Sequence, residues 1–303
     1  MTAHRRIDVI GVPFNSAGTT NGVARAPAAL RGAGLVDAIR RAGIDVADRS
    51  DVRLGATTAE RDPVSHVIAP AALGAMIRGV RSRVAESLAR GAFPLVLGGD
   101  CPILLGCLAA LLARESSAGL VFVDGHEDAW PPERSPSGEA ADMELGFILG
   151  LTDRDLPRDL RISIPRLRFD DVVVLGPRDQ TELRAAGVDT LQGRLMYRTS
   201  AEVAANPVAA ATEAVARMAE SSAWWFHLDL DVLATTSLSA VDYPQPAGLD
   251  WDALGQLSAA ALGDPGVAGW DITIYNPDLD RDGSGAERIT AFIVEALLQA
   301  GRH

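Results

Sequence analysis

The stretch Leu120-Val121-Phe122-Val123-Asp124-Gly125-His126-Glu127-Asp128 is an apolar run that ends in an acidic cluster. A second stretch repeats the pattern further along the chain, as Trp224-Trp225-Phe226-His227-Leu228-Asp229-Leu230-Asp231. Each apolar run is typical of a buried strand, and a bare carboxylate on a core strand is costly unless a cation or another partner compensates its charge. Aspartates and histidines at both strand ends therefore predict a bound metal, most simply a pair of ions.

Strands and helices are expected to alternate outward from these two stretches. Short apolar runs predict strands at residues 7–12, 94–97, 120–124, 171–175, 224–231 and 267–275. Helical spacing of apolar residues is clearest at 70–90, and the predicted helices are 26–41, 70–90, 102–113, 201–219, 251–262 (with Asp250 as N-cap) and 286–299. Because several strands are apolar without alternation, the pattern indicates an α/β fold with a parallel sheet covered on both faces. Without a Gly/Ser-rich linker or a repeat, we expect one domain over residues 1–303.

Composition excludes several classes of protein. Hydrophobic residues make up 48% of the 303 residues, which supplies a sizeable core and argues against global disorder. The net charge is −12 and every basic residue is Arg, so no basic patch indicates nucleic acid and an acidic surface disfavours anionic membranes. The polar start Met1–Arg6 is unlike a signal peptide, and no apolar run reaches the roughly 18 residues of a membrane span. Two cysteines cannot form a disulfide framework, which favours a reducing cytoplasm.

The two acidic clusters have the spacing of metal ligands. Ligands in open parallel sheets gather beyond the carboxyl ends of the strands, and alternate residues of an extended chain share one side. Carboxylates suit Mn²⁺ or Mg²⁺, whereas imidazole favours Mn²⁺, Fe²⁺, Co²⁺ or Zn²⁺. Two cations held by bridging carboxylates activate a shared water, so hydrolysis is the natural chemistry. The predicted ligands are Asp124, His126, Asp128, Asp229 and Asp231, with His227 on the same face.

The chain resembles the ureohydrolase family, which includes arginase, agmatinase and formimidoylglutamase. The family's Gly-Gly-Asp-His, Asp-Ala-His-x-Asp, Asp-x-Asp and Asn-Pro motifs are similar to 98–101, 124–128, 229–231 and 276–277 of this chain. The resemblance covers nearly the whole chain and implies a three-layer α/β/α fold with a central, mostly parallel sheet. It also implies a site for two manganese ions and hydrolysis of a C–N bond in a guanidine or amidine, in a homo-oligomer.

The resemblance implies two sets of metal ligands. One ion would be held by position 101, Asp124, Asp128 and Asp229, and the other by His126, Asp124, Asp229 and Asp231. Asp124 and Asp229 would bridge the two ions.

The chain departs from the family at the first ion. Cys101 stands where the family has a metal-binding His, and a thiolate favours Zn²⁺ or Fe²⁺ over Mn²⁺. We expect Cys101 to begin a helix, whose dipole lowers the pKa of its thiol. The alternative is that Cys101 is a small buried residue, as we expect for Cys107.

Residues that recognise the substrate in the family are also replaced. Ile274 occupies the place of the Glu that pairs with the guanidinium, and Ala141 that of a His that shuttles protons. Ala234-Thr235 replaces the Asp-Pro that follows the second cluster. Recognition is therefore expected to involve other acidic residues of the loop, unless that loop is simply a solvated surface. These residues are Glu139, Asp142, Glu144 and Glu127.

Further residues are candidates for the reaction or for contacts with the substrate. Trp130 could cover the pocket or anchor its own loop, and Tyr243 and Asn276 are candidate substrate contacts. His227 could relay protons, or it could be a satisfied core histidine. The predicted catalytic residues are Asp128, His227 and Glu139.

Three functions follow as hypotheses. The first is a metal-dependent hydrolase of a linear C–N bond in a guanidine, N-hydroxyguanidine or amidine, acting through a metal-activated water on a small molecule. Loss of the guanidinium-binding Glu argues against plain arginine or agmatine as substrates. The second is an amidohydrolase resembling the deacetylases that share this fold, with one zinc on Asp124, His126 and Asp231. The third is a non-catalytic, arginase-like binding protein.

Overall fold

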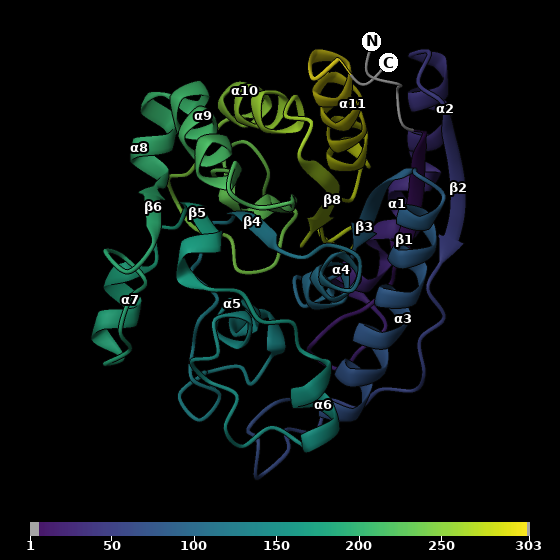
Figure 1. The fold of residues 1–303 in the computed structure, drawn as a ribbon. Coiled ribbons are helices and arrows are strands. Elements are labelled where there is room, and N and C mark those ends of the chain that lie inside the picture. Colours follow the sequence, from purple (N-terminus) through teal and green to yellow (C-terminus); the bar gives the residue numbers. More distant parts are fainter. Residues whose placement is uncertain (1–5, 302–303) are drawn as a thin grey trace.

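Eight strands form a single, all-parallel sheet in the computed structural model, which describes residues 6–301 (Figure 1). The polar start at residues 1–5 lies outside the described residues. The strands follow the order β2-β1-β3-β8-β7-β4-β5-β6 across the sheet. Their bounds are β1 (Ile7–Val12), β2 (Val46–Asp51), β3 (Phe93–Gly98), β4 (Ala118–Val123), β5 (Val172–Gly176), β6 (Met196–Thr199), β7 (Ala223–Asp229) and β8 (Val267–Thr273).

Helices cover both faces of the sheet, so the predicted three-layer α/β/α architecture is confirmed (Figure 1). Strand residues alternate between two hydrophobic cores: Val121 and Val123 of β4 belong to one, and Leu120 and Phe122 to the other. The first core packs against α1 (Ala26–Gly32), α2 (Leu35–Arg41), α8 (Ser200–Ala205), α9 (Pro207–Met218), α10 (Trp251–Leu262) and α11 (Ser284–Gln299). The second packs against α3 (Pro70–Ala89), α4 (Ile103–Leu112), α5 (Glu144–Ile148) and α6 (Arg158–Ser163), while α7 (Gln180–Ala185) follows β5.

Two helices that the sequence predicts as continuous are broken. The helix expected over 26–41 divides into α1 and α2 because Gly34 adopts a left-handed φ of 80°. The helix expected over 201–219 divides into α8 and α9 at Asn206 and Pro207. Pro207 has no N–H to donate within a helix, and the Asn206 side chain accepts a hydrogen bond from Ala209 N as an N-cap. The N-cap predicted at Asp250 is confirmed, since its side chain accepts from Ala253 N.

The two edge strands escaped sequence prediction. β2 is only partly buried along its length and mixes charged with apolar residues, and β6 has four residues. The central strands β1, β3, β4, β5 and β8 are buried throughout, which explains their continuous apolar runs. Between residues 6 and 301, no helix has the length and apolar character needed to cross a membrane.

Candidate metal centre

The carboxyl ends of β4 and β7 place the two acidic clusters side by side. The strands pair in parallel, with Val123 opposite Leu228, so Asp124 and Asp229 emerge from adjacent strand ends. β7 ends at Asp229, whereas the sequence predicts a strand to Asp231. A short 3₁₀ turn over Leu230–Val232 follows instead, in which Asp229 Oδ1 accepts a hydrogen bond of 2.6 Å from Asp231 N. The turn, rather than strand alternation, therefore presents Asp231.

The first cluster is also a turn and not an extended segment. Asp124 Oδ1 accepts a hydrogen bond from His126 N at 2.7 Å, and Asp231 Oδ1 accepts one from Gly125 N at 3.0 Å. A Cβ at Gly125 would lie 2.7 Å from Asp231 Oδ1, so this close approach requires glycine. Asp128 adopts a positive φ of 43°. The predicted ligands therefore converge because the chain turns back on itself, and not because alternate residues of an extended strand share one side.

The predicted ligands gather into overlapping groups. Potential ligand atoms lie within 4.8 Å of one another in each group, and Asp124 belongs to all of them. His126 Nδ1 lies 2.8 Å from Asp231 Oδ2. The groups are Asp124 with His126 and Asp128, Asp124 with Asp229 and Asp231, and Asp124 with Cys101, Glu144 and His227.

Burial and mutual repulsion disturb the acidity of these carboxyls. Burial, and then the neighbouring aspartates, raise the pKa of Asp124, Asp128 and Asp229. Burial acts in the same direction on Asp231, but His126, Arg178 and the N–H of Gly125 together outweigh it and lower the pKa of that carboxyl. Carboxylates so close together are costly in the absence of cations, and a divalent ion removes that cost. The donor set therefore fits divalent metal ions.

A cavity of about 250 Å³ opens onto this cluster. Its lining is strongly acidic, and no arginine belongs to it among the residues described. The lining residues that argue for a substrate site are His126, Asp128, Asp229 and Asp231 from the cluster, with Trp130, Asp142, Asp179, Glu182, Tyr243 and Ile274 around it. A cationic group fits such a cavity better than an anionic one.

The structure brings some of the predicted substrate contacts to the cavity and not others. Trp130, Asp142 and Tyr243 line it, and Tyr243 donates a hydrogen bond of 3.0 Å to Glu139 Oε1 beside it. Asn276 is absent from the lining; its Nδ2 instead donates to Asp242 Oδ1 at 2.5 Å.

Sequence reasoning missed two acidic residues of the cavity, Asp179 and Glu182. Burial raises the pKa of Asp179 to about 7. Both follow the carboxyl end of β5, a position that could have identified them in the sequence.

Comparison with known proteins agrees with the fold. A sequence model of the arginase family matches residues 5–299. The chain belongs to the arginase family.

Individual relatives are distant. Arginase from Brevibacillus brevis is 26% identical over 299 residues, which cover 98% of this chain and 97% of that protein. Arginase from Staphylococcus aureus strain MRSA252 is 30% identical over 190 residues, and the match spans 59% of each protein. The structure of Bacillus caldovelox arginase superposes with a TM-score of 0.83 at 25% identity, and covers 96% of this chain and 98% of that one.

Cys101 lies inside the acidic cluster of this arginase-family chain. Its Sγ is 2.6 Å from Asp229 Oδ2 and 3.0 Å from Thr273 Oγ1. The expected lowering of its pKa is wrong: burial and then the carboxylate of Asp229 raise the pKa of the thiol well above its usual value. Helix α4 begins at Ile103, so Cys101 precedes the helix that it was expected to begin. Cys107 is buried in the core, as expected.

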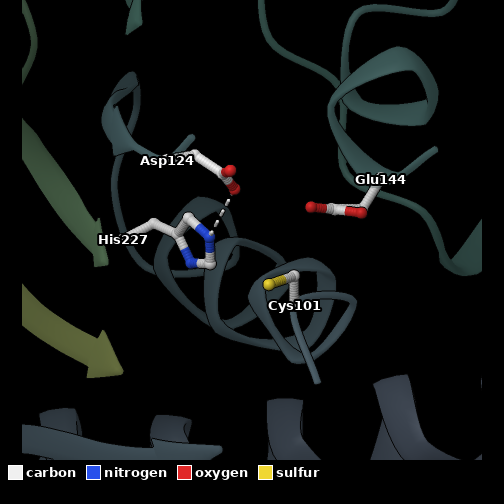
Figure 2. A group of neighbouring side chains, drawn as sticks. All are labelled: Cys101, Asp124, Glu144 and His227. Carbon is white, nitrogen blue, oxygen red and sulfur yellow. Dashed lines mark ion pairs between the residues drawn. The ribbon is translucent and has the colours of Figure 1, made fainter. Parts of the chain in front are cut away.

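His227 is neither a fully satisfied core residue nor a cavity residue. Its Nδ1 lies 2.6 Å from Asp271 Oδ2, while Asp271 Oδ1 accepts a hydrogen bond of 2.5 Å from Trp225 Nε1. The ring stacks on Phe122 with centroids 4.7 Å apart. Within residues 6–301 its Nε2 has no hydrogen-bond partner, and it points to Asp124, whose Oδ2 is 4.0 Å away (Figure 2). One nitrogen of the ring is therefore held by Asp271, and the other faces the potential metal ligands.

Glu127 and Glu144 differ in position, although the sequence suggested both for substrate recognition. Glu127 accepts hydrogen bonds from Tyr197 Oη at 2.8 Å and Leu191 N at 2.5 Å, so it supports the loop from within and does not line the cavity. Glu144 is fully buried and faces the potential metal ligands Asp124, Cys101 and His227 (Figure 2).

Glu139 gives a pH-dependent prediction. Burial, and then the Asp100 carboxylate, raise the pKa of Glu139 from 4.5 to about 7. Between pH 4.5 and about 7, the Glu139 carboxyl is protonated in the folded protein and ionised in the unfolded chain. Its contribution to the free energy of unfolding is therefore fully present below pH 4.5 and is lost as the pH rises towards 7. We expect Glu139→Gln, which stays neutral, to gain stability relative to the unmodified protein over this range. Urea denaturation of metal-free protein at about pH 5 and about pH 8 measures the difference. Glu133→Gln, at an exposed position, is the control, and a difference between Glu139→Gln and its parent that does not change with pH would contradict the role of burial.

Proposed function

We propose that the chain is a metal-dependent hydrolase that cleaves a linear C–N bond of a guanidine, N-hydroxyguanidine or amidine. The observation that carries the proposal is the convergence of the two acidic clusters on one buried centre beneath an acidic cavity. The family supports the proposal, and so do arginase relatives that match most of the chain. The proposal includes two divalent cations, Mn²⁺ or the softer Zn²⁺ or Fe²⁺, in a cytoplasmic homo-oligomer.

The described residues suit the separate tasks of such a reaction. Divalent cations, when bound, supply a water of lowered pKa and neutralise the buried carboxylates. Asp128 both joins the ligand cluster and lines the cavity, so a carboxylate oxygen of Asp128 can take a proton from the attacking water and pass it to the leaving nitrogen. Asp142, Asp179 and Glu182 would bind the cationic part of the substrate.

The wall of the cavity argues for a substrate other than a plain guanidine. Ile274 lines the cavity and its backbone N donates to Gly99 O at 2.8 Å, so the main chain there is fixed. An isoleucine side chain offers no acceptor to a guanidinium. The same observation favours the second candidate, a one-metal amidohydrolase that acts on acetylated amines.

The direct test is a substrate panel with metal-free protein before and after reloading. We expect turnover that depends on added metal with N-hydroxyguanidines or amidines, and little with arginine or agmatine. Turnover of acetylated amines alone would replace the proposal with the amidohydrolase alternative. Absence of metal-dependent turnover on guanidines, amidines and amides would leave the binding-protein hypothesis.

Replacement of Ile274 tests whether the side chain at this position contacts the substrate. We expect Ile274→Glu to raise turnover of a plain guanidine by about tenfold or more, because a charge-assisted hydrogen bond contributes roughly 1.5–3 kcal/mol. Ile274→Gln is the matched control, since it has nearly the same size and no charge. Equal guanidine turnover in the two variants would show that a carboxylate at this position does not contact the substrate.

A further inference from the structure

Four side chains from four segments form one buried group, and one of them, Cys101, also lines the cavity (Figure 2). Cys101 follows β3, Asp124 follows β4, Glu144 begins α5 and His227 lies within β7. One ligand atom from each lies within 4.8 Å of the others, and all four residues are buried. Only Cys101 and Asp124 belong to the ligand sets that the family resemblance implies, and neither of those sets includes Glu144 or His227.

His227 is held as a metal-binding histidine would be held. An ionised carboxylate can only accept a hydrogen bond, so Asp271 places the ring hydrogen on Nδ1. That leaves the lone pair on Nε2, the atom without a partner that faces Asp124. A carboxylate that fixes the tautomer and orientation of a ligating histidine is the usual arrangement around bound metals.

Glu144 supplies a second buried group without a partner. The side chain is 0% exposed, and neither of its oxygens has a hydrogen-bond partner among the residues that the structure describes. In the part of the chain that the structure describes, no arginine forms an ion pair with Glu144. The ionised form of a carboxyl buried in this way is costly unless a cation compensates its charge.

We infer that Cys101, Asp124, Glu144 and His227 together bind one divalent cation, which the thiolate makes selective for Zn²⁺ or Fe²⁺ over Mn²⁺. The inference deepens the proposed function, on which it rests, by changing the ligands of one ion. Ligand atoms of a tetrahedral zinc site are about 3.3–3.6 Å apart. His227 Nε2 and Asp124 Oδ2 lie 4.0 Å apart. Binding displaces the thiol proton, which leaves to solvent.

Titration of the metal-free protein with Co²⁺ tests the inference without a substrate. A cobalt ion bound to a thiolate gives a near-ultraviolet charge-transfer band. We expect this band in the unmodified protein and in the Cys107→Ser control, and its loss in Cys101→Ser. Glu144→Gln and His227→Gln are expected to weaken the cobalt binding that produces the band by about tenfold or more. Added Zn²⁺ should abolish the band, and an equal amount of Mn²⁺ should not.

Asp271→Asn separates ligation from folding. The asparagine can still accept from Trp225, but its amide donates to His227 Nδ1 and moves the ring hydrogen to Nε2. We expect this variant to fold and to lose the affinity for cobalt at the thiolate. Two outcomes would overturn this ligand set and leave the proposed function standing. One is cobalt binding to the unmodified protein without a charge-transfer band. The other is a band that His227→Gln and Glu144→Gln leave unchanged. No cobalt binding at all would overturn both.

Discussion

Asp124→Asn is expected to abolish metal binding at this centre. Asp124 belongs to every group of potential ligands, so no ion can bind there without losing one of its donors. A ligand that binds only the folded state stabilises it by about 2.7 kcal/mol at a hundredfold excess over its Kd. We therefore expect added metal to raise the melting temperature of the unmodified protein and to leave that of the variant unchanged.

Without metal, Asp124→Asn is not expected to destabilise the protein. Burial and the facing Asp231 raise the pKa of Asp124, so a neutral amide in its place removes repulsion. The metal-free variant should be at least as stable as the metal-free parent, which would exclude misfolding as the cause of metal loss. Asp250→Asn is the control, because asparagine caps α10 as well as aspartate does. Metal content in Asp124→Asn equal to that of the parent would contradict this assignment.

Asp271→Ala is expected to be the most destabilising single change near the centre. It leaves Trp225 Nε1 and His227 Nδ1 without their acceptor in a fully buried environment. Unsatisfied buried groups of this kind should cost about 3–5 kcal/mol in the free energy of unfolding. Urea denaturation of the metal-free protein measures that loss without a contribution from bound ions.

A neighbouring aspartate provides the matched comparison. Asp264 accepts a hydrogen bond of 3.0 Å from Trp224 Nε1, but it is partly exposed, so water can replace it. We expect Asp264→Ala to cost about 1 kcal/mol. Equal losses in Asp264→Ala and Asp271→Ala would mean that the buried network around His227 contributes little.

The sequence predicts the centre of the fold well because the central strands leave no ambiguity. β3, β4, β7 and β8 are short, apolar and bounded by turn residues, and parallel pairing alone brings the ends of β4 and β7 together. Edge strands are less distinct because they are partly exposed, as the mixed composition of β2 shows.

The site shows where sequence reasoning ends. The convergence of the aspartates follows from the strand ends, but the turns that present Asp128 and Asp231 could not be derived from alternation. The surroundings of Glu144 and the open Nε2 of His227 depend on contacts between segments far apart in the chain. Glu144 faces the potential metal ligands, whereas Glu127 supports a loop. Nothing in the sequence around either residue predicts this difference.

Metal content per chain shows directly whether cations compensate the buried carboxylates. Elemental analysis should be applied to protein purified without added metal, then to the same protein after loading with Mn²⁺ and Zn²⁺, beside Asp124→Asn. We expect the parent protein to retain metal through purification and to hold two ions per chain after loading, and we expect no bound metal in the variant. Metal in the loaded parent no higher than in Asp124→Asn would contradict this expectation.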